Sequence, residues 1–144
     1  MRWTSDLMTG NAVVDGEHKR LIALIDELEL VGNGPEGREI EVALDELTDY
    51  VFVHFQMEEK LMRREGYPAD ALEAHLAEHR QLDQETQKLV LQYQGGTLNT
   101  VQPIVEFLYE WFRHHIAQVD WAMAQYVRAN HPRAAARRPE DGHR

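Results

Sequence analysis

Cysteine is absent from this chain of 144 residues. Its absence excludes disulfides, iron–sulfur clusters, thiolate zinc sites and cysteine nucleophiles, so any bound metal ion must be held by histidine, aspartate or glutamate. No apolar run approaches the roughly 20 residues that a membrane-spanning helix needs. The first stretch, "MRWTSDLMTGNAVVDGEH", also lacks the apolar core of a secretory signal. We therefore expect a cytoplasmic protein with no membrane partner.

Positive charge is scarce. The chain has 15 Lys and Arg against 25 Asp and Glu, which gives a formal net charge of −10. Because affinity for nucleic acid comes mainly from Lys and Arg that neutralise phosphates, we expect no nucleic-acid partner. The C-terminal end reverses this sign locally, with arginines beside Pro132 and Pro139. Its composition predicts a disordered basic tail over residues 131–144.

Turn-forming residues interrupt the chain at "GNGPEG" (32–37), "EGYP" (65–68) and "QGGT" (94–97). The four segments between these breaks carry apolar residues at alternating spacings of three and four, and no strand pattern competes. Long helices joined by short loops predict an all-α fold, an up-down-up-down four-helix bundle over residues 1–130. We expect residues 1–14 to be irregular, with Trp3 covering one end of the bundle and Asp15 capping the first helix.

Polar residues lie on the apolar stripes of all four segments. His54 and Glu58 are four residues apart, as are His75 and His79, so each pair projects from one helix face. A single buried histidine usually bonds to backbone or water, but that reading weakens when histidines recur on every stripe. Glu58 would be buried with no Lys or Arg on the stripes to balance its charge. A metal ion would supply that charge.

The fourth segment places two histidines side by side in "WFRHHIAQVD". His115 lies on the stripe, whereas His114 is rotated about 100° from it and is expected at the surface. Asp120 follows His115 by five residues, which an ideal α-helix separates by about 140°. Both side chains reach one site if they flank the inward direction, or if a π-bulge rotates the aspartate inward.

The inner set contains five imidazoles and two carboxylates. On a pair of six-coordinate ions, five imidazoles, two bridging carboxylates and one bridging oxygen atom leave a single open position. A pair of tetrahedral zinc ions would break this count. Imidazole with carboxylate suits iron better than magnesium or calcium, and leaves zinc, manganese and copper as alternatives. The candidate metal ligands are His18, His54, Glu58, His75, His79, His115 and Asp120.

Four segments carry a resemblance to a known family: "VDGEHKRLIALI", "HFQMEEKLM", "GYPADALEAHLAEH" and "WFRHHIAQVDWAM". The pattern His…HxxxE…HxxxH…HxxxxD resembles the hemerythrins, in particular their single-domain bacterial members. The resemblance implies two iron ions per chain, bridged by Glu58, Asp120 and a solvent-derived oxygen. It assigns one iron to His18 and His54, and the other to His75, His79 and His115.

The function that the resemblance implies is reversible O2 binding, for storage or for delivery to an oxygen-consuming enzyme, and not catalysis. It also implies an O2 pocket walled by Leu21, Phe55 and Trp111. Arg113 stands where the family often has an apolar residue beside that pocket, and either borders the pocket or points to solvent. Two alternatives remain open: an O2 or redox sensor acting through a partner, and a di-iron enzyme that reduces peroxide or nitric oxide.

Overall fold

A computed structural model of the chain describes residues 3–35 and 37–131. No strand occurs in this part of the chain, and none of its helices is long and apolar enough to cross a membrane. The predicted basic tail, residues 131–144, lies outside the described residues except for His131. The elements are η1 (Ser5–Leu7), α1 (Ala12–Gly32), α2 (Gly37–Arg64), α3 (Ala69–Gln94), α4 (Gln102–His114), the π-helical turn η2 (His115–Asp120) and α5 (Trp121–Asn130).

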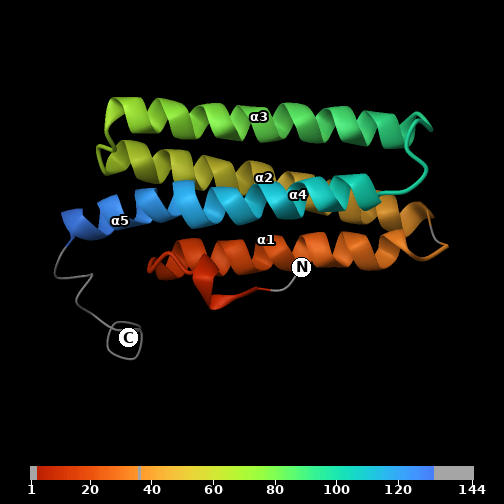
Figure 1. The fold of residues 1–144 in the computed structure, drawn as a ribbon, viewed down its shortest axis with the longest axis horizontal. Helices are drawn as coiled ribbons and strands as arrows, with labels where there is room; N and C mark the ends of the chain where they lie inside the picture. Colours follow the sequence, from red (N-terminus) through yellow and green to blue (C-terminus); the bar gives the residue numbers. More distant parts are fainter. Residues whose placement is uncertain (1–2, 36, 132–144) are drawn as a thin grey trace.

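These elements build a four-helix bundle, because α4, η2 and α5 continue along one line and act as a single rod (Figure 1). The rod packs against α1 and α3, and α2 packs against the same two helices. The three breaks in the sequence coincide with the three loops at the ends of the bundle. The predicted all-α, up-down-up-down fold is confirmed.

The first helix begins earlier than the sequence analysis predicted. Asn11 is the N-cap, since its side-chain oxygen accepts hydrogen bonds from the backbone N–H groups of Val13 and Val14. Asp15, predicted as the cap, is instead buried within the first turn. Its carboxylate accepts from the backbone N–H and hydroxyl of Thr9, at 2.8 and 2.7 Å. Asp15 therefore ties the preceding loop to the helix.

The N-terminal segment is irregular apart from the short turn η1, as expected. Trp3 is partly buried and packs against the larger apolar cluster. The Lys19 ammonium lies 5.7 Å from the centre of its ring, which places Trp3 beside the second turn of α1. This segment thus covers a flank of α1.

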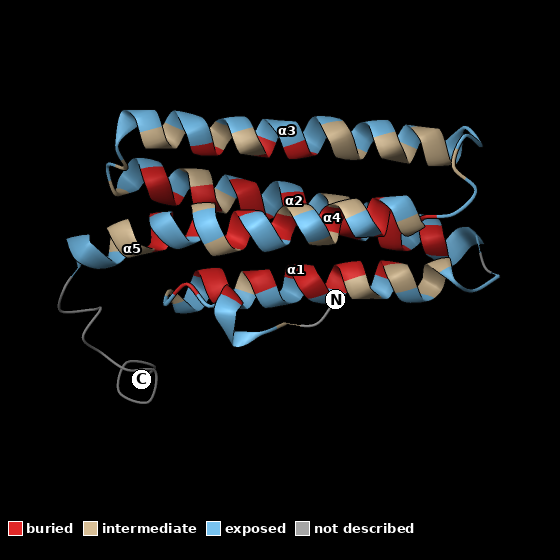
Figure 2. Ribbon diagram, in the orientation of Figure 1, coloured by how far each residue is buried: buried red, intermediate tan, exposed pale blue. Residues whose placement is uncertain are grey.

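Buried residues line the inner side of each helix (Figure 2). They form two apolar clusters, a large one built mainly from α1, α2 and α4, and a small one of Val14, Leu61, Met62 and Met123. In each of the four helices of the bundle, the polar residues of the apolar stripe lie between the two clusters. On α1, for example, His18 is one turn from Val14 and three residues from Leu21. The bundle thus encloses a polar layer capped by apolar side chains on both sides.

Gly32 at the end of α1 gives a test of this packing. A Cβ atom added there would overlap Cγ2 of Val101, a buried side chain with restricted rotamers. We expect Gly32→Ala to lower the free energy of unfolding by about 1–3 kcal/mol in urea denaturation. Gly16→Ala on the same helix meets nothing within 4 Å and should instead stabilise by about 0.5–1 kcal/mol. Shifts of the same sign for both variants would contradict the tight contact.

Candidate metal centre

The π-helical turn η2 sets the relation between His115 and Asp120. The Trp121 backbone N–H bonds to the carbonyl of Ile116, five residues back, as a π-turn requires. With one more residue in the turn than an α-helix has, residues five apart share a face. His115 Nε2 lies 3.1 Å from Asp120 Oδ1, and both residues are buried. The structure agrees with the π-bulge alternative.

The same turn shifts the buried face of the helix beyond it. Continued as an α-helix, the stripe through His115 would reach Ala122, but Ala122 is exposed and Met123 is buried in its place. The extra residue in η2 advances the buried face by one position from there onward. An α-helical register projected through a π-turn is therefore wrong by one residue beyond it.

All seven predicted ligand side chains meet in one buried layer, and each residue is at most 3% exposed. Glu58 lies at the middle of this layer. Its Oε2 is 3.4 Å from His18 Nε2 and 3.0 Å from His54 Nε2. Its Oε1 is 3.3 Å from His75 Nε2 and 3.1 Å from His79 Nε2. Each carboxylate oxygen of Glu58 thus faces a different group of histidines.

The two carboxylate oxygens of Asp120, on the rod opposite α2, likewise face different groups of histidines. Its Oδ2 lies 2.9 Å from His18 Nε2, whereas its Oδ1 lies 3.0 Å from His75 Nε2 and 3.1 Å from His115 Nε2. Two groups of potential ligand atoms result, each with all its atoms within 4.8 Å of one another. The first group is Glu58, His75, His79, His115 and Asp120, and the second is His18, His54, Glu58 and Asp120.

Several polar atoms in this layer are close together without being hydrogen-bonded. Both carboxylate oxygens of Asp120 and the Nε2 atoms of His54 and His115 are buried and have no hydrogen-bond partner among residues 3–35 and 37–131. The neighbouring atoms lie within 3.1 Å, so the distances suit a bond and the directions do not. Lone pairs that converge in this way on a shared point fit a metal ion, which would satisfy them all.

Three further carboxylates orient the histidines, and the sequence analysis missed them. Glu17 Oε1 lies 2.9 Å from His54 Nδ1, Glu59 Oε2 lies 3.1 Å from His79 Nδ1, and Glu78 Oε1 lies 2.8 Å from His115 Nδ1. Because a carboxylate only accepts, each Nδ1–H donates, and Nε2 is the nitrogen that a metal ion would bind in place of a proton.

A pattern in the sequence marks these three glutamates in retrospect. Each is adjacent in the chain to a ligand of its own helix but supports a ligand of the next rod: Glu17 precedes His18, Glu59 follows Glu58, and Glu78 precedes His79. Adjacent residues lie about 100° apart around a helix, which turns the second side chain from the centre toward the neighbouring helix. Within the described part of the chain His18 and His75 have no such support, since their Nδ1 atoms have no hydrogen-bond partner there.

The charges of the layer are strongly coupled. Burial opposes the charged imidazolium, but the carboxylates of Glu58, Glu17 and Asp120 together outweigh it and raise the pKa of His54 to about 10. The pKa of His115 is likewise raised to about 10 against burial, chiefly by Asp120. Conversely, burial raises the pKa of Glu58, and the facing imidazolium groups bring it well below its usual range. Protons thus supply the balancing charge that a metal ion would replace.

The predicted pocket residues divide between the two histidine groups. The Phe55 ring stacks on His79 with centroids 3.7 Å apart, and the Trp111 ring stacks on His115 at 4.3 Å. Leu21 is buried one turn from His18. Arg113 is exposed and is not part of the buried layer, which corresponds to the solvent-facing alternative. His114 is exposed, as predicted.

These observations define a class: an all-helical bundle with a buried layer of histidines and carboxylates arranged as a metal-binding centre. Comparison with known proteins then gives the family. The sequence model of the family described as "Hemerythrin HHE cation binding domain" matches residues 9–127. The chain belongs to the hemerythrin family.

Named relatives agree with this assignment. The chain is 31% identical to a bacteriohemerythrin of Stenotrophomonas maltophilia over 128 residues, which cover 89% of this chain and 82% of the relative. It is 32% identical to a bacteriohemerythrin of Methylococcus capsulatus, with 83% and 91% covered. A crystal structure of wild-type hemerythrin superposes with a TM-score of 0.79 at 31% identity, covering 88% of this chain and 97% of that one. The buried ligand set suits the non-haem di-iron site expected for the family.

The adjacent histidines of α4 and η2 give a direct test of the ligand assignment. We expect His115→Ala to bind less metal per chain, because it removes a buried imidazole nitrogen that faces Asp120. His114→Ala changes only an exposed side chain and should keep the full metal content. Metal analysis of both purified proteins makes the measurement. Equal losses would show that the register of the rod is wrong.

Glu78 tests the outer carboxylates. Its hydrogen bond to His115 lowers the pKa of the Glu78 carboxyl, so the pair stabilises the ionised carboxylate. Glu78→Gln removes that charge, and we expect the affinity for divalent iron to fall about tenfold in competition with a chelator. Glu73→Gln on the same helix is the matched control, since Glu73 is exposed and its carboxylate lies 3.5 Å from the exposed Arg80, away from the candidate ligands. An unchanged Glu78→Gln affinity would contradict the orienting role.

Proposed function

We propose that the chain binds O2 reversibly at a di-iron centre held by the buried layer, for storage or for delivery to an oxygen-consuming enzyme. The observation that carries this proposal is the division of both carboxylates. Glu58 and Asp120 each turn one oxygen toward the His18 and His54 side and the other toward the side of His75. Two carboxylates in this arrangement favour a bridged pair of ions over one ion.

The unequal histidine groups favour a ligand-binding centre. One ion would take His75, His79 and His115, and the other only His18 and His54. With both carboxylates and a solvent-derived oxygen bridging, the open position would belong to the two-histidine ion. Bound iron would supply the electrons that hold O2 there.

The described residues of the buried layer can bind metal ions, and none of them is left over to act as a separate proton donor or acceptor. Every histidine and carboxylate in the layer faces the centre and would act as a ligand, and among the described residues no Lys or Arg is buried. A hydrolytic or redox enzyme needs a proton donor or acceptor separate from the ligands. Leu21 and Phe55, which are buried beside the ligands, would exclude water from a bound diatomic molecule. We therefore favour a non-enzymatic protein, with residues 1–130 as its domain.

Sensing of O2 or redox state through a partner is the second candidate. One feature favours it: Glu17, Glu59 and Glu78 bond to ligands and yet remain 27%, 30% and 33% exposed. A change of charge at the centre would reach the surface through these three carboxylates. Such a role would show as altered partner binding upon oxidation.

Reversibility is the decisive property. Protein purified in the reduced state without air would be exposed to O2 and then freed of it, while the visible spectrum is followed. We expect the oxygenated spectrum to return to the colourless reduced one over repeated cycles, with two irons per chain by metal analysis. Irreversible oxidation would favour the sensor or an enzyme. One iron or two zincs per chain would overturn the di-iron proposal.

A further inference from the structure

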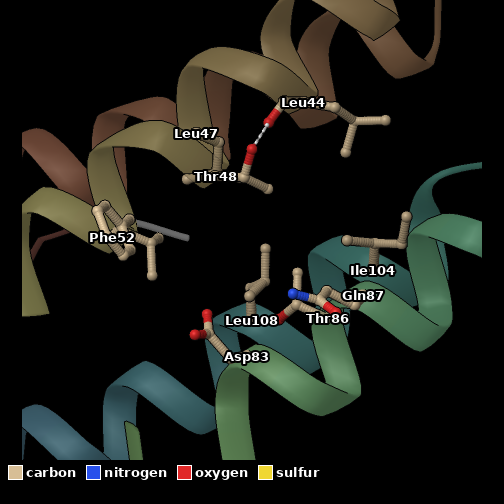
Figure 3. A pocket seen from close by; sticks show the side chains of 10 residues that line it. Leu44, Leu47, Thr48, Phe52, Asp83, Thr86, Gln87, Ile104 and Leu108 are labelled. Carbon is tan, nitrogen blue, oxygen red and sulfur yellow. Dashed lines mark hydrogen bonds between the residues drawn. The ribbon is translucent and has the colours of Figure 1, made fainter. Parts of the chain in front are cut away.

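A cavity lies outside the candidate metal centre, between α2 and α3, with α4 as its floor (Figure 3). Its volume is about 270 Å³. For comparison, an apolar cavity of about 150 Å³ in another protein holds benzene. Leucine, isoleucine and valine side chains of α2 and α4 make up half of the lining residues, and Phe52, which also lines the cavity, is 56% exposed. The cavity is thus large enough for a small organic molecule with an apolar body.

The polar atoms of the cavity are concentrated on α3. Asp83, Thr86 and Gln87 are spaced at three and four residues, so they share one helix face, and Figure 3 shows them opposite Thr48 and Phe52 of α2. The Thr86 hydroxyl oxygen is buried and has no hydrogen-bond partner among the described residues. The Thr48 hydroxyl, by contrast, bonds to the Leu44 carbonyl at 3.0 Å. Thr86 thus lines the cavity with a hydroxyl whose hydrogen-bonding capacity is not satisfied.

The charge at the cavity is negative. Within the described residues the Asp83 carboxylate has no Lys or Arg partner and no hydrogen bond. Burial raises the pKa of Asp83, while of the two charged side chains that act on it His79 lowers this pKa and the Glu59 carboxylate raises it. A cationic group beside Asp83 would compensate for the burial of its carboxylate and for the repulsion from Glu59, whereas an anion would be repelled. Charge complementarity thus selects among molecules of the right size.

We propose that this cavity is a binding site for small amphipathic amines, with the apolar body between α2 and α4, and the ammonium group beside Asp83 and the Thr86 hydroxyl. The ammonium donates hydrogen bonds to both oxygens. The exposed face of Phe52 offers a further contact for the cation or for an aromatic ring. None of these residues is a candidate metal ligand, so the site is separate from the centre.

Three probes with the same ring separate the contributions: benzylamine, benzyl alcohol and benzoate, titrated calorimetrically into the metal-loaded protein. We expect benzylamine to bind most tightly and benzoate least. The visible spectrum is followed in parallel, and it should not change, since binding at the cavity leaves the metal ligands untouched. A spectral change that tracks the heat of binding would place the amine on the metal and overturn the proposal.

Variants on α3 assign the contacts. Asp83→Asn should weaken benzylamine about threefold and leave benzyl alcohol unchanged, because only the amine is charged. Thr86→Val should weaken both about fivefold, by loss of one hydrogen bond, and Thr86→Ser should restore most of that affinity. The matched control Glu73→Gln removes an exposed charge of the same helix at no cavity residue and should change nothing. Benzylamine affinity that is equal in Asp83→Asn and the unaltered protein would refute the amine site.

Discussion

Two carboxylates buried without a Lys or Arg counter-ion are the constraint on which the rest of this structure depends. Glu58 and Asp120 are both 0% exposed, and in the described part of the chain no basic side chain other than histidine is buried with them. Such charges are costly unless something positive compensates them. Five imidazoles surround them, and their Nε2 atoms converge with the carboxylate oxygens toward the same centre. The arrangement of the four helices of the bundle therefore depends on compensation of these two negative charges as well as on apolar packing.

In the rod formed by α4, η2 and α5, the need to place Asp120 in the buried layer outweighs the preference of the backbone for a regular α-helix. An α-helix would turn Asp120 away from His115, and a π-turn is a rare conformation. Here the turn η2 places both residues on the buried face and displaces the apolar stripe beyond it by one residue. The backbone accepts a less common hydrogen-bonding pattern so that Asp120 reaches the centre from the side opposite Glu58. The conformation of the backbone at η2 thus follows from where the Asp120 carboxylate must lie.

The sequence predicts the helices and the ligands because both depend on period and spacing. Gly, Pro and Asn mark the loops, and a histidine on each apolar stripe can be placed from the helix period alone. What it does not predict is contact between side chains of different helices. Glu17, Glu59 and Glu78 lie beside ligands in the chain, yet whether each meets an imidazole depends on the rotation and spacing of the neighbouring helix. The start of α1 was missed for a similar reason, since Asp15 bonds back to Thr9 rather than capping.

The uneven burial of the helices links the metal centre to the cavity. α3 buries only His75, His79 and Leu82, so two of its three buried residues belong to the polar layer. Its remaining inward positions, among them Thr86, are only partly buried, and there the cavity opens toward α2. An apolar stripe as complete as that of α1 would have closed this space. Beyond its histidines α3 packs against the large apolar cluster through Leu82 and the partly buried Leu89, Val90 and Tyr93. This looser packing leaves the space that forms the cavity.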